Sequence, residues 1–292
     1  MDPTTLEAPE SDDVVITPGQ AWAELLGAVK RPAAPVRNSF VQRPRDDKAG
    51  RDQQRGALLS VLVRGHQTRA LDGYLALLAL ERLLGPDEPW HSKVWARLLA
   101  TSDVPIPEAS VSRTWKQLED HGLIERTRRR RQALVRPRLE DASGPYIHLG
   151  TNAEVQATGG WPVREAYFQV PHDYWLQGHH RHLSLAGKAM LLVALQATGR
   201  SPDFYLPQES APAWYGLSAE TVQRGIAELK DLDVLSVRHE RIPAARAPEG
   251  YTVRHHYTPT GPYALKRRQA ASKATTAQIR ARQAGTQGQV PA

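Results

Sequence analysis

The amino-acid sequence predicts an α+β fold that is mainly helical, with two domains in tandem. Two observations support this prediction. The segment 111–139 combines an amphipathic helix, a glycine at the helix end, and two short strands around an arginine-rich turn. The same pattern begins again 111 residues later, at Val222. A repeat of this length indicates that one structural unit of the chain is duplicated.

The helix of the first segment has one apolar face. Val111, Trp115 and Leu118 are spaced at i, i+4 and i+7, which is the period of side chains that share one face of an α-helix. Gly122 follows at the position where a chain that leaves a helix often needs a positive φ angle. We therefore expect a helix that packs on the core through one side and exposes the opposite side.

Further elements surround this helix. Two apolar segments upstream, 71–84 and 91–100, predict two buried helices, and the segments 123–128 and 133–139 predict two paired strands. The order helix, helix, helix, strand, strand is that of a winged helix-turn-helix domain. The sequence therefore predicts two winged helix-turn-helix domains in tandem, with disordered N-terminal and C-terminal arms.

The second copy keeps the apolar face of the helix and one outward arginine. At a shift of 111 residues, Arg113 matches Arg224. Asp233 takes the place of Gly122, which predicts a looser or differently shaped helix exit in the second copy. The other elements expected in this copy are a helix over 186–197, a shorter helix or turn over 206–215, and strands over 234–240 and 251–257.

The predicted boundaries follow from local composition. Polar and proline-rich sequence without a sustained apolar period is typical of disorder, whereas an amphipathic segment such as 21–29 predicts a short helix. That helix would be a transient structure or a docking peptide. The predicted parts are a disordered arm (1–55), a first winged-helix domain (56–140), a linker (141–165), a second winged-helix domain (166–263) and a basic disordered tail (264–292).

Composition restricts the partners and the compartment. The 292 residues carry a formal net charge of +7 and a sequence pI of about 9.7, which favours an anionic partner. The absence of cysteine excludes disulfides and thiolate metal sites and suits a reducing compartment. No apolar segment is long enough to cross a membrane. We expect a cytoplasmic, nucleoid-associated protein without a membrane partner.

Two segments of the sequence resemble a known family. SVSRTWKQLEDHGLIER resembles the recognition-helix region of bacterial winged-helix transcription regulators, and LSAETVQRGIAELKDLDVL is similar but lacks the glycine. Two winged helices in one chain also resemble, in architecture alone, plasmid replication initiators that bind repeated origin sites. The resemblance implies a fold and double-stranded DNA binding, and it leaves the cellular process open.

The N-terminal part of a recognition helix contacts base edges in the major groove of DNA. Arginine can contact guanine through two hydrogen bonds, and glutamine can do the same with adenine. The candidate base-contacting residues are Ser112, Arg113, Lys116 and Gln117 in the first copy, and Thr221, Gln223 and Arg224 in the second.

The basic hairpins have a different expected role. Arginines in such turns contact phosphates or enter a narrow minor groove, and they contribute affinity rather than sequence preference. A solvated charged hairpin is the alternative interpretation. The candidate phosphate or minor-groove residues are Arg126, Arg128, Arg129, Arg130, Arg131, Arg238, Arg241 and Arg254.

Enzymatic interpretations have less support. His172, His179, His180 and His182 form a cluster, which raises the hypothesis of a catalytic metal site. However, no carboxylate is well placed to complete such a site, and a polar loop is the preferred interpretation. The sequence has no nucleotide-binding GxxxxGK[ST] loop. We therefore predict a protein that is not an enzyme and uses no metal or cofactor.

The sequence thus predicts sequence-specific binding of double-stranded DNA by a bacterial transcription regulator. A plasmid or mobile-element replication initiator is the first alternative, and a protein-interaction scaffold is the second. The expected partners are double-stranded DNA and host replication or transcription proteins. The chain would act as a monomer or a homodimer.

Overall fold

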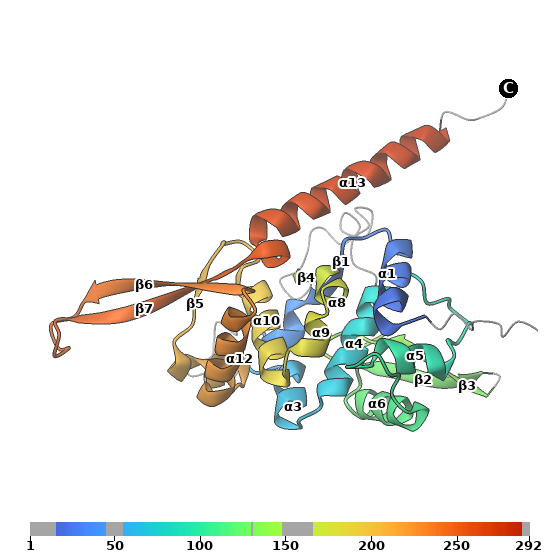
Figure 1. Cartoon of the computed structure of the whole chain (residues 1–292), viewed down its shortest axis with the longest axis horizontal. Helices are drawn as coiled ribbons and strands as arrows, with labels where there is room; N and C mark the ends of the chain where they lie inside the picture. The colour runs from blue at the N-terminus through green and yellow to red at the C-terminus, as the bar shows by residue number, and fades with distance from the viewer. Residues whose placement is uncertain (1–15, 45–54, 130, 148–165, 288–292) are drawn as a thin grey trace, which may run out of the picture.

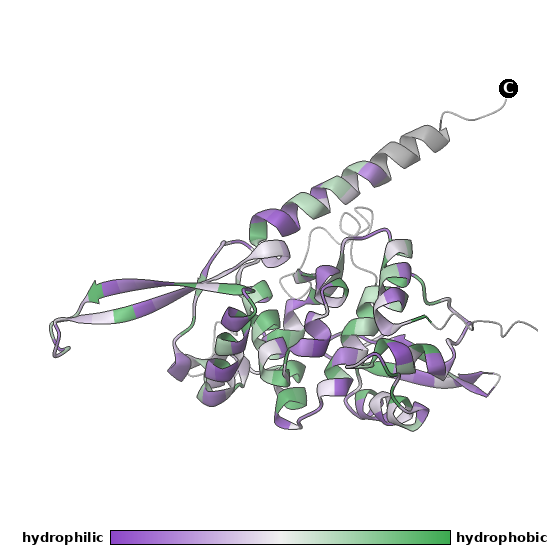
Figure 2. Cartoon of the chain, in the orientation of Figure 1, coloured by the Kyte–Doolittle hydropathy of each residue, from purple (hydrophilic) through white to green (hydrophobic). Residues whose placement is uncertain are grey.

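The computed structural model describes residues 16–44, 55–129, 131–147 and 166–287 (Figure 1). Over these residues the protein is α+β, as predicted. The helices pack against one another, and the strands form three small antiparallel sheets. Apolar residues concentrate on the helices at the centre of the molecule, whereas the two long hairpins are more polar (Figure 2). In the part of the chain that is described, no helix is long and apolar enough to span a membrane.

The first half is built around one buried helix. Its elements are α3 (Leu58–Arg64), α4 (Thr68–Leu80), α5 (Ser92–Leu98), α6 (Glu108–Asp120), β2 (Ile124–Arg129) and β3 (Gln132–Pro137). Every residue of α4 from Ala70 to Leu80 is buried. Gly73 allows α6 to approach α4, because a Cβ atom there would lie 3.0 Å from the Thr114 side chain and 3.2 Å from Trp115. The predicted helices and strands of this half are present, with ends shifted by a few residues.

The second half repeats this plan with one additional strand. Its elements are α10 (Leu185–Ala197), β5 (Phe204–Tyr205), the 3-10 helix η2 (Gln208–Ser210), α11 (Ala211–Tyr215), α12 (Ala219–Asp231), β6 (Leu235–Pro243) and β7 (Tyr251–Pro259). α12 lies against α10 so closely that a Cβ atom at Gly225 would overlap the Ala186 carbonyl. β5 pairs with β7, so the sheet has the order β5-β7-β6.

The N-terminal segment belongs to the folded body. It contains α1 (Pro18–Ala28), β1 (Ala33–Arg37) and α2 (Asn38–Val41), and it contacts β4 (Tyr167–Pro171), α8 (Asp173–Leu176) and α9 (His179–His182). β1 pairs with β4 in antiparallel register. The Trp22 ring of α1 stacks on Trp175 at 5.2 Å, and its Nε1 donates to the Leu98 carbonyl at 3.1 Å.

These contacts correct the prediction of a disordered arm for residues 16–44. The predicted helix at 21–29 exists, but it docks on its own chain and is therefore neither a transient structure nor a peptide free for another protein. Residues 1–15 and 45–54 lie outside the described residues.

The two halves share one hydrophobic core, which runs from α1 and α4 to α10 and the second sheet. At its centre, the Lys188 ammonium of α10 lies 2.7 Å from both carboxylate oxygens of Asp72 in α4. Both side chains are buried. Burial raises the pKa of Asp72, while the neighbouring Lys188 acts in the opposite direction. The predicted boundary between two domains is therefore not a break in the core.

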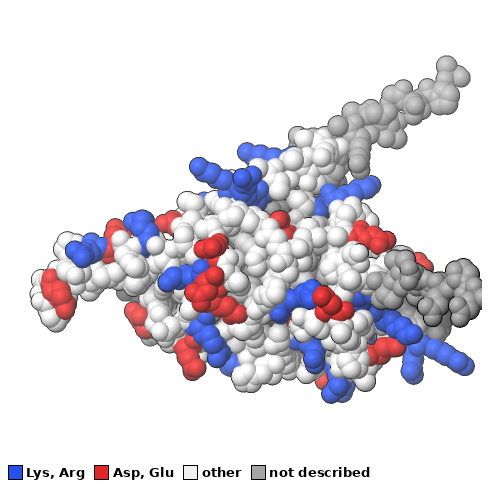
Figure 3. Space-filling view, viewed as in Figure 1, with Lys and Arg blue, Asp and Glu red and all other residues white. Residues whose placement is uncertain are grey.

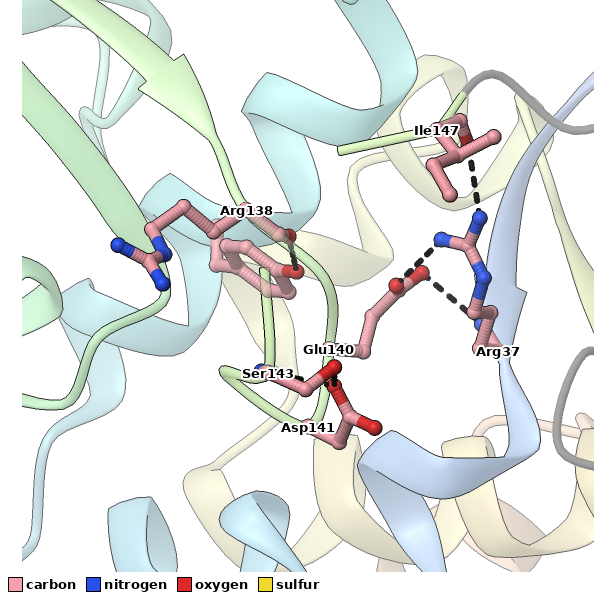
Figure 4. Close-up of polar contacts among 7 residues, drawn as sticks. Arg37, Arg138, Glu140, Asp141, Ser143 and Ile147 are labelled. Carbon is pink, nitrogen blue, oxygen red and sulfur yellow. Dashed lines mark hydrogen bonds and ion pairs between the residues drawn. The ribbon is translucent and has the colours of Figure 1, made fainter. Parts of the chain in front are cut away.

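A second buried ion pair ties the first hairpin to β1. The Arg37 guanidinium donates to Glu140 at 2.7 Å and to the Ile147 carbonyl at 2.7 Å, and the Arg37 backbone N–H donates to the same carboxylate at 3.0 Å (Figure 4). Burial raises the pKa of Glu140, and Arg37 opposes this shift. The Tyr74 hydroxyl of α4 also donates to the Arg138 carbonyl at 2.8 Å. The segment that follows β3 is therefore fixed to β1 through Glu140 and to α4 through Arg138.

The predicted linker begins at this ion pair. Residues 141–147 are described and contain an isolated bridge between Arg138 and Pro145. The rest of the predicted linker, residues 148–165, lies outside the described part.

The C-terminal segment forms a helix, which corrects the predicted disordered tail over residues 265–287. A 3-10 helix, η3 (Gly261–Tyr263), leads into α13 (Leu265–Gln287). Arg268 anchors α13, because its buried guanidinium donates to the Tyr263 carbonyl at 2.9 Å and to the Thr198 carbonyl at 2.9 Å. Thr198 is the C-cap of α10, where a cation satisfies free carbonyl groups. Burial lowers the pKa of Arg268 to about 10.

Two histidines of the cluster, His172 and His180, pack inside the protein, whereas His179 is half-buried and His182 is exposed. His180 is buried, with its ring 5.7 Å from that of Trp22, and its Nδ1 lies 3.3 Å from the Tyr174 carbonyl oxygen. His172 is buried against Trp175. Burial lowers the pKa of His172 to about 4 and that of His180 to about 3. Both rings are therefore neutral near pH 7, as apolar surroundings require.

This burial predicts that the protein loses stability in mild acid. Both folded-state pKa values lie below the ordinary value of 6.5. The unfolded chain therefore binds more protons as the pH falls below 6.5, and folding stability decreases. Each histidine should remove about 2 kcal/mol between pH 7 and pH 5. Urea unfolding at the two pH values measures the loss.

Two variants test the cause of this loss. His180→Gln should remove about 2 kcal/mol of the change in stability between pH 7 and pH 5. His239→Gln, at an exposed position on β6, should leave it unchanged. An equal pH dependence in wild type and His180→Gln would contradict the assignment.

Candidate nucleic-acid interface

The helix α6 and the hairpin that follows it have a counterpart 111 residues later. α6 runs from 108 to 120 and α12 from 219 to 231, and the following strands begin at 124 and 235. In both helices the predicted inward positions are buried, including Val111 and Trp115 in the first and Val222 and Ile226 in the second. The repeat inferred from sequence therefore corresponds to two equivalent pieces of structure.

The two helix exits have the same geometry. Gly122 has φ +69° and Asp233 has φ +54°. In the first exit, the Leu123 N–H donates to the Leu118 carbonyl at 2.9 Å. The equivalent bond from Val234 to Leu229 measures 2.8 Å. Both are the hydrogen bonds of a Schellman motif, so the prediction of a differently shaped second exit is wrong.

The candidate base-contacting side chains of α6 share its outer face. Ser112, Arg113, Lys116 and Gln117 are all exposed. Lys116 forms an ion pair with Asp120 at 3.1 Å, but both side chains are well exposed and such pairs are weak. The Arg113 guanidinium donates to the Ser110 hydroxyl at 3.2 Å. The four side chains remain available for a partner on this face.

α12 presents a smaller set. Gln223 and Arg224 are exposed, whereas Thr221 is half-buried. The Thr221 hydroxyl lies 2.9 Å from that of Ser218, the N-cap residue, and the Thr221 N–H donates to the same hydroxyl. Thr221 thus belongs to the helix cap. Glu228 faces α10, where it accepts hydrogen bonds from the Ser184 backbone and hydroxyl at 2.6 Å.

The arginines of the first hairpin face two directions. Because side chains alternate along a strand, Arg126 and Arg128 share the face of the buried Ile124, which packs toward α6. Arg126 is half-buried, and its guanidinium lies 2.7 Å from the Glu119 carboxylate. Arg128 is exposed, as is Arg131 at the turn with φ +66°. Arg130 lies outside the described residues.

Arg129 faces the other way and has a partner that the sequence analysis missed. Its guanidinium lies 3.1 Å from Asp87, in the loop between α4 and α5. The same carboxylate is 3.5 Å from Arg136, which also donates to the Pro86 carbonyl. Two arginines therefore share one carboxylate. The only sequence signal was an acidic pair between prolines in that loop, which does not indicate a contact with the hairpin.

The second hairpin offers fewer free cations. Arg241 lies over the Tyr251 ring at 4.9 Å, and Arg254 lies over the Tyr205 ring at 4.8 Å. Arg238 is 3.8 Å from Asp203. The three predicted phosphate-contacting arginines of this hairpin thus already contact aromatic rings or a carboxylate. In the first hairpin, Arg128 and Arg131 have neither an ion pair nor an aromatic contact among the described residues.

The elements have a definite arrangement in the molecule. In Figure 1, α6 and α12 lie along the lower side, and the two hairpins extend toward opposite ends. α13 projects from the upper side. Figure 3 shows Lys and Arg side chains along the lower side and at the base of α13, interspersed with acidic side chains. α13, the described part of the basic C-terminal segment, points away from the side that carries α6 and α12.

The described residues contain no group of three His, Cys, Asp or Glu side chains that could hold a metal ion. In the histidine cluster, His179 Nδ1 lies 2.7 Å from the Tyr263 hydroxyl.

No protein-family model matches the chain, and no curated protein or solved structure is significantly similar to it. Function is therefore inferred from the geometry of the described residues.

The shared helix exit predicts a stabilising substitution. Asp233 adopts a left-handed conformation, which costs an L-residue roughly 1 kcal/mol and glycine very little. Asp233→Gly should therefore raise the free energy of unfolding by about 0.5–1 kcal/mol. Urea denaturation at pH 7 measures this change.

The first copy supplies the reciprocal control. Gly122→Ala should destabilise the protein, because it introduces the same strain and a Cβ atom 3.1 Å from that of Ala142. If Asp233→Gly lowered the stability, the equivalence of the two exits would be contradicted.

Proposed function

We propose that the protein is a sequence-specific double-stranded DNA-binding protein with two winged-helix modules. The observation that carries the proposal is the duplicated unit: a helix with an exposed polar face, a Schellman exit and a hairpin. In this proposal α6 and α12 are recognition helices, whose N-terminal side chains contact base edges in the major groove. The hairpins are the wings.

The order of elements supports this proposal. In the second half, α10, β5, α11, α12, β6 and β7 follow one another, and β5 closes a three-stranded sheet by pairing with β7. This is the order of a winged helix. The first half has α4, α5, α6 and a hairpin in the same order, without the third strand.

The shared core changes how two modules would bind. Two modules joined by a flexible linker would dock one after the other. Here Asp72, Lys188 and the continuous apolar core fix one half against the other. A binder preorganised in this way avoids the entropic cost of ordering its parts. We therefore propose that both helices bind one continuous and asymmetric DNA site.

The proposed process is transcription regulation. Initiation of plasmid or mobile-element replication is the alternative, and the position of α13 favours it. An acid-free helix that projects away from α6 and α12 could bind a protein of the replication machinery while DNA is bound. A genome-wide binding map separates the two processes: scattered promoters support regulation, and one cluster of repeats at an origin supports initiation.

The proposal predicts different effects for helix and hairpin arginines. A preferred duplex is first selected from a random pool. Arg113→Ala should then relax selectivity at one base pair, with a loss of ~1–3 kcal/mol of discrimination. The double variant Arg128→Ala and Arg131→Ala should weaken binding to all duplex sequences by the same factor. It should also reduce the slope of log K against log salt by about 2.

Binding of wild type and variants to a panel of single-base substitutions measures both effects. Arg224→Ala provides the matched test in the second module and should relax selectivity at a different base pair. If wild type selects no sequence, or if both types of variant behave alike across the panel, the division of roles is wrong. Absence of any duplex binding would favour a protein-interaction scaffold.

The Asp87 contact predicts a variant that binds DNA more tightly. Asp87→Asn should release Arg129 and Arg136 for phosphate, and it should strengthen duplex binding by about two- to fivefold at low salt, which matches the small energies of exposed ion pairs. Glu88→Gln is the control, because it changes net charge equally at an exposed neighbour that forms no ion pair with the described residues. Equal effects of the two variants would show that only net charge matters.

A further inference from the structure

A groove lies between α5, α6 and the β2–β3 hairpin. It has a volume of about 540 Å³, which is within the range of small-molecule sites. One side is aromatic and the other is basic. The residues that define it are Trp90, Trp95, Trp115, Arg126, Arg128 and Arg131.

On the aromatic side, the Trp90 ring packs against Trp95, which in turn packs against Trp115. Trp90 is half-buried and stacks on Trp95 with ring centroids 5.3 Å apart and planes inclined by 30°. Trp95 meets Trp115 edge to face at 5.1 Å, and both of these rings are buried. Among the three, Trp90 is therefore the ring that a ligand can reach, and the two behind it fix its plane.

The basic side carries charge without a local counterion. Arg126 is held by Glu119, but Arg128 and Arg131 are exposed and form no ion pair with the residues that the structure describes. No carboxylate is among the described residues that line the groove. Ser112 and Gln132 add polar groups to the wall. The groove is thus suited to a ligand with a flat ring and a negative charge.

We propose that this groove binds a nucleoside phosphate, with the base against Trp90 and the phosphate at Arg128 and Arg131. Stacking on an aromatic ring is available to every base and gives little sequence preference, and arginine pairs with phosphate through parallel hydrogen bonds. A base inside a duplex cannot reach such a ring, because it is stacked between its neighbours. The ligand is therefore either a free nucleotide or an unpaired nucleotide of DNA.

The aromatic side of this site is separate from the proposed duplex contacts, because Trp90 precedes α5 and is not one of the candidate base-contacting residues. Ser112, Arg128 and Arg131 belong to both the groove and the proposed duplex contacts. An occupied groove would lie beside Ser112 and the first hairpin. Ligand binding there would couple to duplex binding through shared residues, which is the arrangement that an effector site requires.

Fluorescence anisotropy with two probes tests the proposal: AMP carrying a methylanthraniloyl group, and a fluorescein-labelled pentanucleotide of thymidine. Trp90→Leu removes the π-system but keeps apolar bulk, and it should weaken binding at least about fivefold, the lower bound for loss of one stacked base. Trp90→Tyr should restore most of the affinity. Trp214→Leu, in α11, is the control and should have no effect.

The outcomes separate the ligand sources. Binding of the AMP probe alone identifies a free nucleotide, and binding of the pentanucleotide alone identifies unpaired DNA. Duplex binding by Trp90→Leu should stay at the wild-type level. A protein that binds a probe through Trp90 but binds no duplex would retain this inference and lose the proposed function.

Three results would overturn the inference. Neither probe binds, Trp90→Leu binds the probes like wild type, or Trp90→Leu weakens duplex binding and probe binding equally. Thermal unfolding shows whether each variant folds. Should Trp90→Leu fail to fold, photocrosslinking of 8-azido-AMP and of a 5-iododeoxyuridine oligonucleotide to wild type replaces it. Crosslinks within residues 90–95 or 126–133 would support the groove, and crosslinks elsewhere would exclude it.

Discussion

The buried ion pair between Asp72 and Lys188 determines how the two halves of the protein meet. It joins α4 to α10 at the centre of the core, where desolvation makes an unpaired charge expensive. Removing one partner of such a pair typically costs 3–5 kcal/mol, because the other charge stays buried alone. α6 packs on α4, and α12 packs on α10. The ion pair therefore also sets the separation of the two exposed helix faces.

Local sequence patterns predicted the elements of the fold but not the contacts that assemble them. The period of Val111, Trp115 and Leu118 identified α6, and its repetition identified α12, because an amphipathic face is encoded within a few turns. The pairing of β1 with β4 has no such signal, since its strands are short and far apart in sequence. Arg268 resembled other solvated cations of the tail, although it caps α10.

The same limit applies to the candidate interface. Helical periodicity placed Arg113 and Gln117 on an exposed face, because burial of the opposite face leaves them no other position. It could not show that Arg126 pairs with Glu119 or that Thr221 belongs to a helix cap. Nor could it bring Trp90 beside the hairpin, because the groove forms only when a loop, a helix and a strand pair converge.

Asp87 gives the first hairpin a counterion of its own. A carboxylate attached to the chain cannot diffuse away, so its displacement by a DNA phosphate adds no translational entropy to the solvent. Release of condensed ions is the main source of electrostatic affinity for DNA. An arginine that leaves Asp87 to bind a DNA phosphate thus contributes less to the affinity for DNA than an arginine that had only solvent ions beside it. Counting arginines alone overstates the electrostatic affinity of this hairpin.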